Sequence, residues 1–243
     1  MEADAYTLMA SHEADHWWFV GRRAVIEGLL DRMALPRDAR ILEAGCGTGG
    51  NLYLLQARGQ VFAFEPHEAA IAIARDRYPG IAIQEGELPR LLPFPDESFD
   101  LVAALDVLEH IDDDREGLKA LVRQVRPGGY LLLSVPTHPI LWGSHDRRLH
   151  HRRRYDVGEL RRSLEMPGTS LEYFGAYNML LAPIAFALRL AEKVVPLDFG
   201  NQERLPPRPL NAALAAVFAI EGRLVRTWQL PFGLSHAAIL RRT

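Results

Sequence analysis

The sequence predicts an α/β fold in which a mostly parallel sheet carries helices on both faces. Short apolar runs of strand type alternate with helical apolar patterns along most of the chain. The first run, residues 40–44, leads through a turn with four glycines into a helical pattern, the arrangement of a nucleotide-binding corner. The chain has 243 residues, of which 48% are hydrophobic and 24% charged, which fits one large domain over residues 1–243.

Composition excludes several classes of protein. The net charge of −3 provides no global field that would attract nucleic acid. Cys46 is the only cysteine, so an internal disulfide framework is excluded. The first residues are acidic, unlike a signal peptide, and the longest uncharged apolar stretch, residues 179–190, is shorter than the about 20 residues that span a bilayer. We therefore expect a cytoplasmic protein without a transmembrane segment.

The N-terminal part, residues 1–37, is predicted to be a helical cap on the rest of the chain. Residues 1–15 are polar and are expected to be loose or weakly helical. The apolar residues between Val25 and Met33 follow helical spacing, and Pro36 ends that helix. The elements predicted next are strands 40–44, 61–65, 81–84, 99–105 and 130–135, with helices 69–77 and 113–125 between them.

The C-terminal part departs from a strict alternation of strand and helix. Asp156 caps a short helix, which leads into the sixth strand at residues 171–177. Residues 177–231 form a helical insertion, expected to be a pair of helices beside the ligand crevice. The predicted segments are the core 38–176, insertion helices 179–195 and 210–228, the Pro-rich connector 196–209 and a last strand within 232–243.

The glycine turn has two interpretations. Gly45, Gly47 and Gly50 match the dinucleotide pattern G-x-G-x-x-G, with an acid, Glu65, about 20 residues later. Glu43 decides between the interpretations, because an acid two residues before the first glycine points into the ligand crevice from the end of the strand. Its charge would repel a dinucleotide phosphate and attract an ammonium or sulfonium group.

The run Glu43-x-Gly45-x-Gly47-x-Gly49 resembles the motif of the class I S-adenosylmethionine-dependent methyltransferases. The resemblance covers residues 38–176. It implies a Rossmann-like sheet of seven strands with the last strand antiparallel, and it implies S-adenosylmethionine as the cofactor.

The resemblance also implies roles for acids at later strand ends. Glu65 is expected to accept hydrogen bonds from both ribose hydroxyls, each contributing roughly 1.5–3 kcal/mol. An acid after the third strand is expected to bind the adenine amino group. Glu87 takes that position, followed by Leu88 where related enzymes often have a small residue, and Glu85 is the alternative.

The run from Asp106 to His110 resembles the fourth-strand motif of small-molecule methyltransferases. By that resemblance Asp106 lies near the methionine part of the cofactor and His110 near the donor methyl group. No Asn-Pro-Pro-Tyr-like run, typical of enzymes that methylate base or glutamine nitrogens, is present. An acceptor amino group on nucleic acid is therefore disfavoured.

The N-terminal helix offers Trp18 and Arg22, one helical turn apart, to the carboxylate end of the cofactor. The alternative is that the tryptophans pack in the core. The full set of predicted cofactor contacts is Trp18, Arg22, Glu43, Ala44, Gly45, Cys46, Gly47, Asn51, Glu65, Pro66, Glu87, Leu88, Asp106, Val107 and His110.

Residues 136–155 are rich in histidine and arginine and follow the fifth strand at the crevice end. A loop of this length is more often a lid or a substrate loop than a simple connection. Metal binding is disfavoured, because Asp146 is the only acid there and the spacings do not match a structural zinc pattern. Nucleic-acid binding is disfavoured by the short basic run and the acidic chain. A solvated basic surface and a loop that binds an anionic substrate through arginine remain, and we favour the substrate loop.

Methyl transfer requires mainly alignment of acceptor, methyl group and sulfur. A hydroxyl acceptor must also lose a proton, for which a histidine is the natural base. We predict His145 as this base, with Asp146 or Asp106 as its orienter and His110 as the alternative base.

The predicted function is methyl transfer from S-adenosylmethionine to a small molecule, more often at oxygen than at nitrogen or carbon. The first alternative is a regulatory or scaffold protein that binds the nucleoside without turnover, and the second is a dehydrogenase. The acceptor is expected to be a small molecule with anionic character. No nucleic-acid partner and no metal are expected, whereas a homodimer and peripheral contact with a membrane through residues 179–190 remain open.

Overall fold

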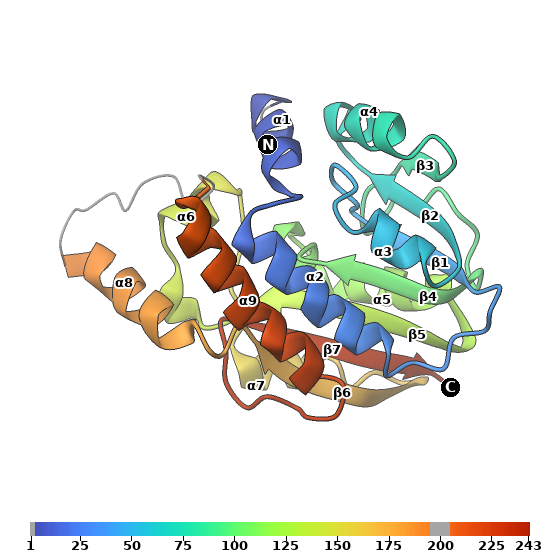
Figure 1. Ribbon diagram of the computed structural model, residues 1–243. Coiled ribbons are helices and arrows are strands. Elements are labelled where there is room, and N and C mark those ends of the chain that lie inside the picture. Colours follow the sequence, from blue (N-terminus) through green and yellow to red (C-terminus); the bar gives the residue numbers. More distant parts are fainter. Residues whose placement is uncertain (1–2, 195–204) are drawn as a thin grey trace.

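The computed structural model describes residues 3–194 and 205–243 and confirms the α/β fold. Its centre is a seven-stranded sheet with the order β3-β2-β1-β4-β5-β7-β6 (Figure 1). As predicted, β7 runs antiparallel to both of its neighbours, while the other strands run parallel. The strands are β1 (Arg40–Ala44), β2 (Gln60–Glu65), β3 (Ala82–Glu85), β4 (Phe99–Leu105), β5 (Val125–Pro136), β6 (Thr169–Tyr177) and β7 (Ser235–Arg242).

Helices cover both faces of the sheet over two separate clusters of buried apolar side chains. One cluster lies under α2, α3, α4 and α9, and the other lies under α5 and α7. The helices are α1 (Ala3–His12), α2 (Trp17–Leu30), α3 (Leu52–Gln56), α4 (Glu68–Arg77), α5 (Asp114–Gln124), α6 (Ser144–Arg148), α7 (Val157–Ser163), α8 (Ala182–Val194) and α9 (Arg208–Leu224), with 3-10 helices η1 (Leu108–His110) and η2 (Pro139–Leu141).

The strand order positions the site. β1 has β2 on one side and β4 on the other, so the direction in which the chain moves across the sheet reverses at β1. Connections after β1 and β4 leave in opposite directions at such a point, and a ligand crevice opens at the carboxyl ends of the strands. The predicted acids at the ends of β1, β2 and β4 therefore lie along one edge. A depression of about 630 Å³ that includes Leu30, Pro36 and Gln56 lies away from this edge.

The insertion helix α9 packs along α2, far from α9 in the sequence but beside it in the fold (Figure 1). Glycines allow this close approach: a β-carbon on Gly28 would lie 2.0 Å from the carbonyl oxygen of Gly222. Phe218 of α9 fills the space over Gly21, where a β-carbon would meet its ring at 2.3 Å. Helix α9 therefore belongs to the helical layer that covers the sheet, and the helical cap that the sequence predicts beside the crevice stays a prediction.

The bounds of several elements differ from the predictions. Helix α8 begins at Ala182, after the turn at residues 178–181. Helix α9 ends at Leu224, four residues before Trp228, and most of the predicted connector lies outside the described residues. Residues 3–12, expected to be loose or weakly helical, form the helix α1. Among the described helices, none combines the length and the apolar character that crossing a bilayer demands.

Candidate functional site

The glycine turn bends the chain sharply at the end of β1. Gly45, Gly47 and Gly49 have φ values of +69°, +54° and +87°, which residues with a side chain rarely adopt. A β-carbon on Gly45 would also lie 2.8 Å from a methyl group of Val107. The backbone N–H groups of Gly45 and Cys46 donate to the carbonyl oxygen of Phe64, at 2.9 and 3.1 Å. The turn is therefore held against the end of β2.

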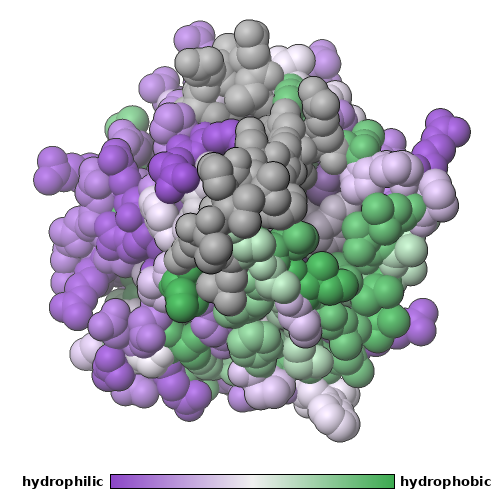
Figure 2. Space-filling view, turned by 90° about the vertical axis from the view of Figure 1, so that its left-hand side faces the viewer, coloured by the Kyte–Doolittle hydropathy of each residue, from purple (hydrophilic) through white to green (hydrophobic). Residues whose placement is uncertain are grey.

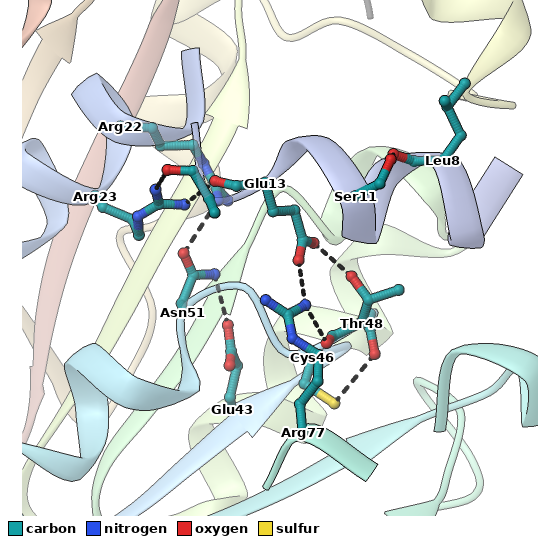
Figure 3. A network of polar contacts seen from close by, with 12 residues as sticks. Leu8, Ser11, Glu13, Arg22, Arg23, Glu43, Cys46, Thr48, Asn51 and Arg77 are labelled. Carbon is teal, nitrogen blue, oxygen red and sulfur yellow. Dashed lines mark hydrogen bonds and ion pairs between the residues drawn. The ribbon is translucent and has the colours of Figure 1, made fainter. Parts of the chain in front are cut away.

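A chain of buried polar side chains crosses the carboxyl edge of the sheet (Figure 3). Asn51 donates from Nδ2 to Glu43 Oε1 at 2.8 Å and accepts from Arg22 Nη1 at 3.5 Å. Arg22 in turn forms an ion pair with Asp106, with 2.7 Å between Nη2 and Oδ2. Four predicted site residues from α2, β1, the start of α3 and the end of β4 thus meet.

Asp106 is held in an unusual backbone conformation. Its φ is +59°, in the left-handed region that aspartate tolerates better than most residues. Ser134 donates to Asp106 Oδ1 at 3.0 Å, and Tyr177 donates to the same oxygen at 3.5 Å. Strained residues of this kind persist where the surroundings determine their position, and they cluster at functional sites.

In this row of polar side chains, the two carboxyl groups of Glu43 and Asp106 stand against a single guanidinium, that of Arg22. Glu43 is 1% exposed, and its Oε2 has no hydrogen-bond partner among the described residues. Burial raises the pKa of Glu43 to about 7, and the Asn51 hydrogen bond and the Arg22 charge only partly oppose this. Burial opposes the charge of Arg22, but Asp106, Tyr177 and Glu43 together outweigh burial and raise the pKa of Arg22. The unpaired Oε2 of Glu43 is therefore suited to a cationic ligand, which would favour the ionised carboxylate.

Glu65, at the end of β2, faces the glycine turn. Its two oxygens accept the backbone N–H groups of Gly47 at 3.0 Å and His67 at 3.3 Å. Burial raises its pKa, and these two hydrogen bonds counteract the rise. Because each carboxylate oxygen can accept a further hydrogen bond, this geometry leaves capacity for vicinal hydroxyls.

The structure does not single out one acid for the adenine amino group. Glu87 and Glu85 are both exposed, and Leu88 is 8% exposed within the apolar cluster that includes Phe64. The Leu88 side chain therefore packs in the core. Pro66 lies at the exposed turn after β2. The adenine role of Glu87 stays a prediction.

Helix α1 and the residue that follows it cover the glycine turn. Glu13 accepts hydrogen bonds from Thr48 Oγ1 at 2.5 Å and from Arg77 Nη1 at 2.6 Å (Figure 3). The ring of Tyr6, which is buried, lies 5.5 Å from that of His67. Sequence reasoning missed these residues, and no local pattern marks Glu13, because its partners are 35 and 64 residues away.

Trp18 packs within the helical layer. Its ring centroid lies 5.5 Å from that of Phe218 and 6.1 Å from that of Trp17. This geometry matches core packing, the alternative to a cofactor contact. Arg22, one turn later, points to the polar chain, so the two residues of the proposed pair have different surroundings.

In the loop after β5, Asp146 is fully buried and orders the histidines and arginines around it. Its Oδ1 accepts from His151 Nδ1 at 3.1 Å and from Arg154 at 2.7 Å, and its Oδ2 accepts from Gly143 N–H at 2.9 Å. These hydrogen bonds do not include His145, although the Asp146 charge acts on the pKa of His145, so the prediction that Asp146 orients His145 stays a prediction. The described contacts of Asp106 are with Arg22, Ser134 and Tyr177, and its role as the alternative orienter stays a prediction as well.

Both predicted bases lie near His151; the His145 side chain is half-buried, and His110 keeps an exposed surface while its neighbours remove water from part of the ring. Burial lowers the pKa of His145 to about 3, and Arg189 adds to this effect. Burial also lowers the pKa of His110 to about 4, with a contribution from His151. His110 lies in η1 and packs edge to face with His151, 4.8 Å between ring centroids. Both imidazoles are therefore neutral at pH 7, and each is a weak base.

The fold and the site define a class. A seven-stranded sheet with antiparallel β7, a glycine turn after an acid-tipped β1, and an acid at the end of β2 form a nucleoside-binding edge of the class I methyltransferase type.

Comparisons with known proteins agree with this class. Residues 42–133 match the family model described as a methyltransferase domain. A protein of Mycolicibacterium smegmatis named as a probable S-adenosylmethionine-dependent methyltransferase is 35% identical over 161 residues, 65% of this chain and 61% of that protein. Residues 42–133 are therefore similar to a methyltransferase domain, and the chain spans about three fifths of the length of this relative.

Solved structures share the fold over nearly the whole chain. An S-adenosylmethionine-dependent methyltransferase of Thermotoga maritima has a TM-score of 0.58 at 20% identity and covers 98% of each chain. The [4+2]-cyclase SpnF also has a TM-score of 0.58, at 22% identity, over 92% of this chain and 81% of that one. At these identities the likeness shows the fold alone.

Proposed function

We propose that the protein transfers the methyl group of S-adenosylmethionine to a small-molecule acceptor, with oxygen as the receiving atom. The observation that carries the proposal is the buried polar chain from Glu43 through Asn51 and Arg22 to Asp106. Two acids, Glu43 and Asp106, act on Arg22 there, and Glu65 lies at the adjacent strand end. A ligand with a carboxylate, an ammonium, a sulfonium and vicinal hydroxyls matches these groups.

The polar side chains at this edge are each proposed to contact one part of the cofactor. Arg22 binds the carboxylate of the cofactor through its guanidinium, which pairs well with two oxygens. Glu43 and Asp106 face the ammonium group, and Glu65 accepts from the ribose hydroxyls. Gly45 and Gly47 keep the main chain free of side chains where the nucleoside lies.

When bound, S-adenosylmethionine supplies an electrophilic methyl group whose sulfur leaves as a neutral thioether. The protein's contribution is to align the acceptor with that methyl group and to take the acceptor's proton. His145 stays our candidate base, because the buried Nδ1 of its neutral imidazole has no hydrogen-bond partner among the described residues; since its pKa is about 3, the bound acceptor must raise that pKa for the proton to transfer. His110 is the alternative.

Two measurements test the proposal. Calorimetry with S-adenosylhomocysteine should show one binding site, and NAD should not compete. A labelled methyl donor, screened against hydroxyl and carboxyl acceptors, should then transfer its label. Absence of S-adenosylhomocysteine binding by folded protein would refute the cofactor assignment. In the same assay, His145→Ala should slow turnover with binding intact, and an unchanged rate removes His145 from the role of base.

A second candidate function is nucleoside binding without methyl transfer. The observation that favours it is the likeness to a [4+2]-cyclase, since this fold is not restricted to methyl transfer. Tight S-adenosylhomocysteine binding together with no labelled product from any acceptor would select this alternative.

The proposed partners are argued from exposed side chains of the loop after β5 and of α8. Arg147 and Arg148 are exposed, and they support an anionic acceptor. Ile184 and Leu188 of α8 are 62% and 44% exposed. Figure 2 shows the face that carries α8, where apolar residues gather on one side and hydrophilic ones on the other. An apolar face of this kind supports a homodimer or peripheral membrane contact, and a cytoplasmic location stays a prediction.

A further inference from the structure

Glu109 is a buried acid whose side-chain oxygens form no hydrogen bond with another described residue. It lies in η1, three residues after Asp106, and is 0% exposed. Neither of its oxygens has a hydrogen-bond partner among the described residues. A buried carboxylate is costly unless it is protonated, paired with a cation or bound to a metal. The structure therefore needs an explanation for Glu109 that the proposed cofactor contacts do not provide.

Two imidazoles lie next to this carboxylate. One ligand atom each from Glu109, His110 and His151 lie within 4.8 Å of one another. Glu109 and His110 are neighbours in η1, whereas His151 comes from the loop after β5, about forty residues later. The fold alone brings the third residue to the first two.

The second nitrogen of each imidazole is already engaged. His151 Nδ1 contacts Asp146 Oδ1 at 3.1 Å, and Asp146 is fixed there by Arg154 and Gly143. His110 makes a hydrogen bond with the backbone of His150. Histidines that bind metals typically donate their other ring N–H to a carboxylate or a backbone carbonyl, which orients the ring and exposes the remaining nitrogen. His151 and His110 both have this arrangement, and Nε2 of His151 is left for a ligand.

We propose that Glu109, His110 and His151 bind one divalent transition-metal ion. Two imidazoles and one carboxylate favour Zn²⁺, Fe²⁺, Co²⁺ or Mn²⁺, whereas Mg²⁺ and Ca²⁺ prefer sets of oxygen ligands. Metal–ligand bonds of about 2.0–2.2 Å require the three ligand atoms to approach each other by roughly an ångström from their widest separation here. The ion would also neutralise the Glu109 carboxylate.

The position of the site suggests a use for the ion. η1 directly follows the strand end that carries Asp106, so the ion lies beside the polar chain. Three protein ligands leave at least one coordination position for water or a substrate oxygen. An acceptor hydroxyl bound there would lose its proton more readily, because a metal ion lowers the pKa of a bound oxygen. This use rests on the proposed function, whereas metal binding itself does not.

The sequence disfavoured a metal for a reason that the structure removes. Asp146 is the only acid within residues 136–155, and it contacts His151 Nδ1 instead of belonging to the three-residue group. Glu109 supplies the carboxylate from a distant part of the chain.

The test is calorimetric titration of Zn²⁺ into protein that carries no affinity tag and has been freed of metal by a chelator. Binding of Co²⁺, followed by its visible absorption, gives a second readout of nitrogen and oxygen ligands. We expect one equivalent of either ion to bind without any cofactor present. Glu109→Gln, which keeps the shape of the side chain, and His151→Ala should each weaken binding by at least about 100-fold, more than the 10- to 100-fold typical of the residues that orient ligands.

His150→Asn is the matched control. His150 is an exposed neighbouring imidazole with a φ of +56°, a conformation that asparagine tolerates, and it lies outside the three-residue group. Its substitution should leave the metal affinity unchanged. The proposal is overturned if folded wild-type protein binds no ion, if Glu109→Gln binds as tightly as wild type, or if His150→Asn loses binding equally.

Thermal unfolding separates loss of the site from loss of the fold. Zn²⁺ should raise the melting temperature of wild type and of His150→Asn but not that of Glu109→Gln. Binding of S-adenosylhomocysteine, measured on the same samples, reports the proposed function independently. Metal binding without nucleoside binding would reject the proposed function alone, and the reverse result would reject the metal site alone.

Discussion

Asp106 joins the parts of the candidate site through one carboxylate. Its left-handed backbone directs one oxygen to Arg22 and the other to Ser134 and Tyr177. Arg22 is buried, so its charge depends on this partner. At the residue scale, the site is therefore a set of buried charges whose balance can be tested by isosteric changes.

Asp106→Asn should weaken binding of S-adenosylhomocysteine and destabilise the protein. Asparagine keeps the shape and tolerates the positive φ, but it leaves the Arg22 charge buried without its counter-ion. Breaking such a pair costs about 3 kcal/mol. Urea denaturation measures this loss. Asp112→Asn is the control, since the Asp112 side chain is 84% exposed in its contact with Arg152 and should change neither quantity. Wild-type stability in Asp106→Asn would contradict the assigned role.

Glu43 should make ligand binding depend on pH. Its pKa of about 7 in the folded protein lies above the ordinary 4.5. Glu43 is therefore largely protonated at pH 6 and ionised at pH 8, and only the ionised form attracts a cationic ligand. The affinity for S-adenosylhomocysteine should rise by about tenfold between these pH values. In Glu43→Gln the rise should disappear; if it persists, another group is responsible.

The same shift has the opposite sign for the stability of the ligand-free protein. Because the folded state holds the Glu43 proton more tightly than the unfolded state, this contribution to stability is present at low pH and is lost as pH rises from about 4.5 to about 7. The loss amounts to about 3 kcal/mol for the full shift. Denaturation midpoints of wild type and Glu43→Gln across this range measure it.

At the scale of elements, two contacts between distant segments shape the site. α9 packs on α2 through glycines, which holds Arg22 over the sheet, and α1 covers the glycine turn through Glu13. Arg23 donates to the Glu13 carbonyl oxygen at 2.6 Å and fixes the corner between α1 and α2.

Gly28→Ala should separate α2 from α9. The added β-carbon would lie 2.0 Å from the Gly222 carbonyl oxygen, which is backbone and cannot rotate away. We expect a loss of about 1–3 kcal/mol of unfolding free energy, as is usual for overpacking. Gly80→Ala is the matched control, because no atom lies within 4 Å of its added carbon. Equal stability of the two variants would contradict the close packing.

Glu13→Ala should loosen the contact between α1 and the glycine turn. The variant loses the hydrogen bonds that Thr48 and Arg77 donate to Glu13. A hydrogen bond between charged groups, such as the one from Arg77, contributes about 1.5–3 kcal/mol. Release of bound S-adenosylhomocysteine, followed by stopped-flow displacement, should become about tenfold faster. Ser11→Ala changes an exposed residue of the same helix and should leave the release rate unchanged. A wild-type rate in Glu13→Ala would show that α1 does not retain the ligand.

At the scale of the whole molecule, the proposed binding at the carboxyl edge would involve α1, α2, β1, β2, β4 and the loop after β5. A ligand that contacts so many elements should stabilise the fold as one unit. At 100 times its dissociation constant, S-adenosylhomocysteine should add about 2.7 kcal/mol of stability, visible as a single shifted melting transition, and NAD should have no effect. Stabilisation by NAD would favour the dinucleotide interpretation.

The sequence by itself determined the elements and the nature of the ligand edge. Apolar periodicity marks strands and helices, and the spacing Glu43-x-Gly45-x-Gly47-x-Gly49 marks the turn, because these properties depend on neighbouring residues and on backbone angles that only glycine adopts readily. The tertiary structure alone decided which distant side chains meet. The contacts of Glu13 with Arg77, Arg22 with Asp106, and Glu109 with His151 depend on how elements cross, and no local pattern records a crossing.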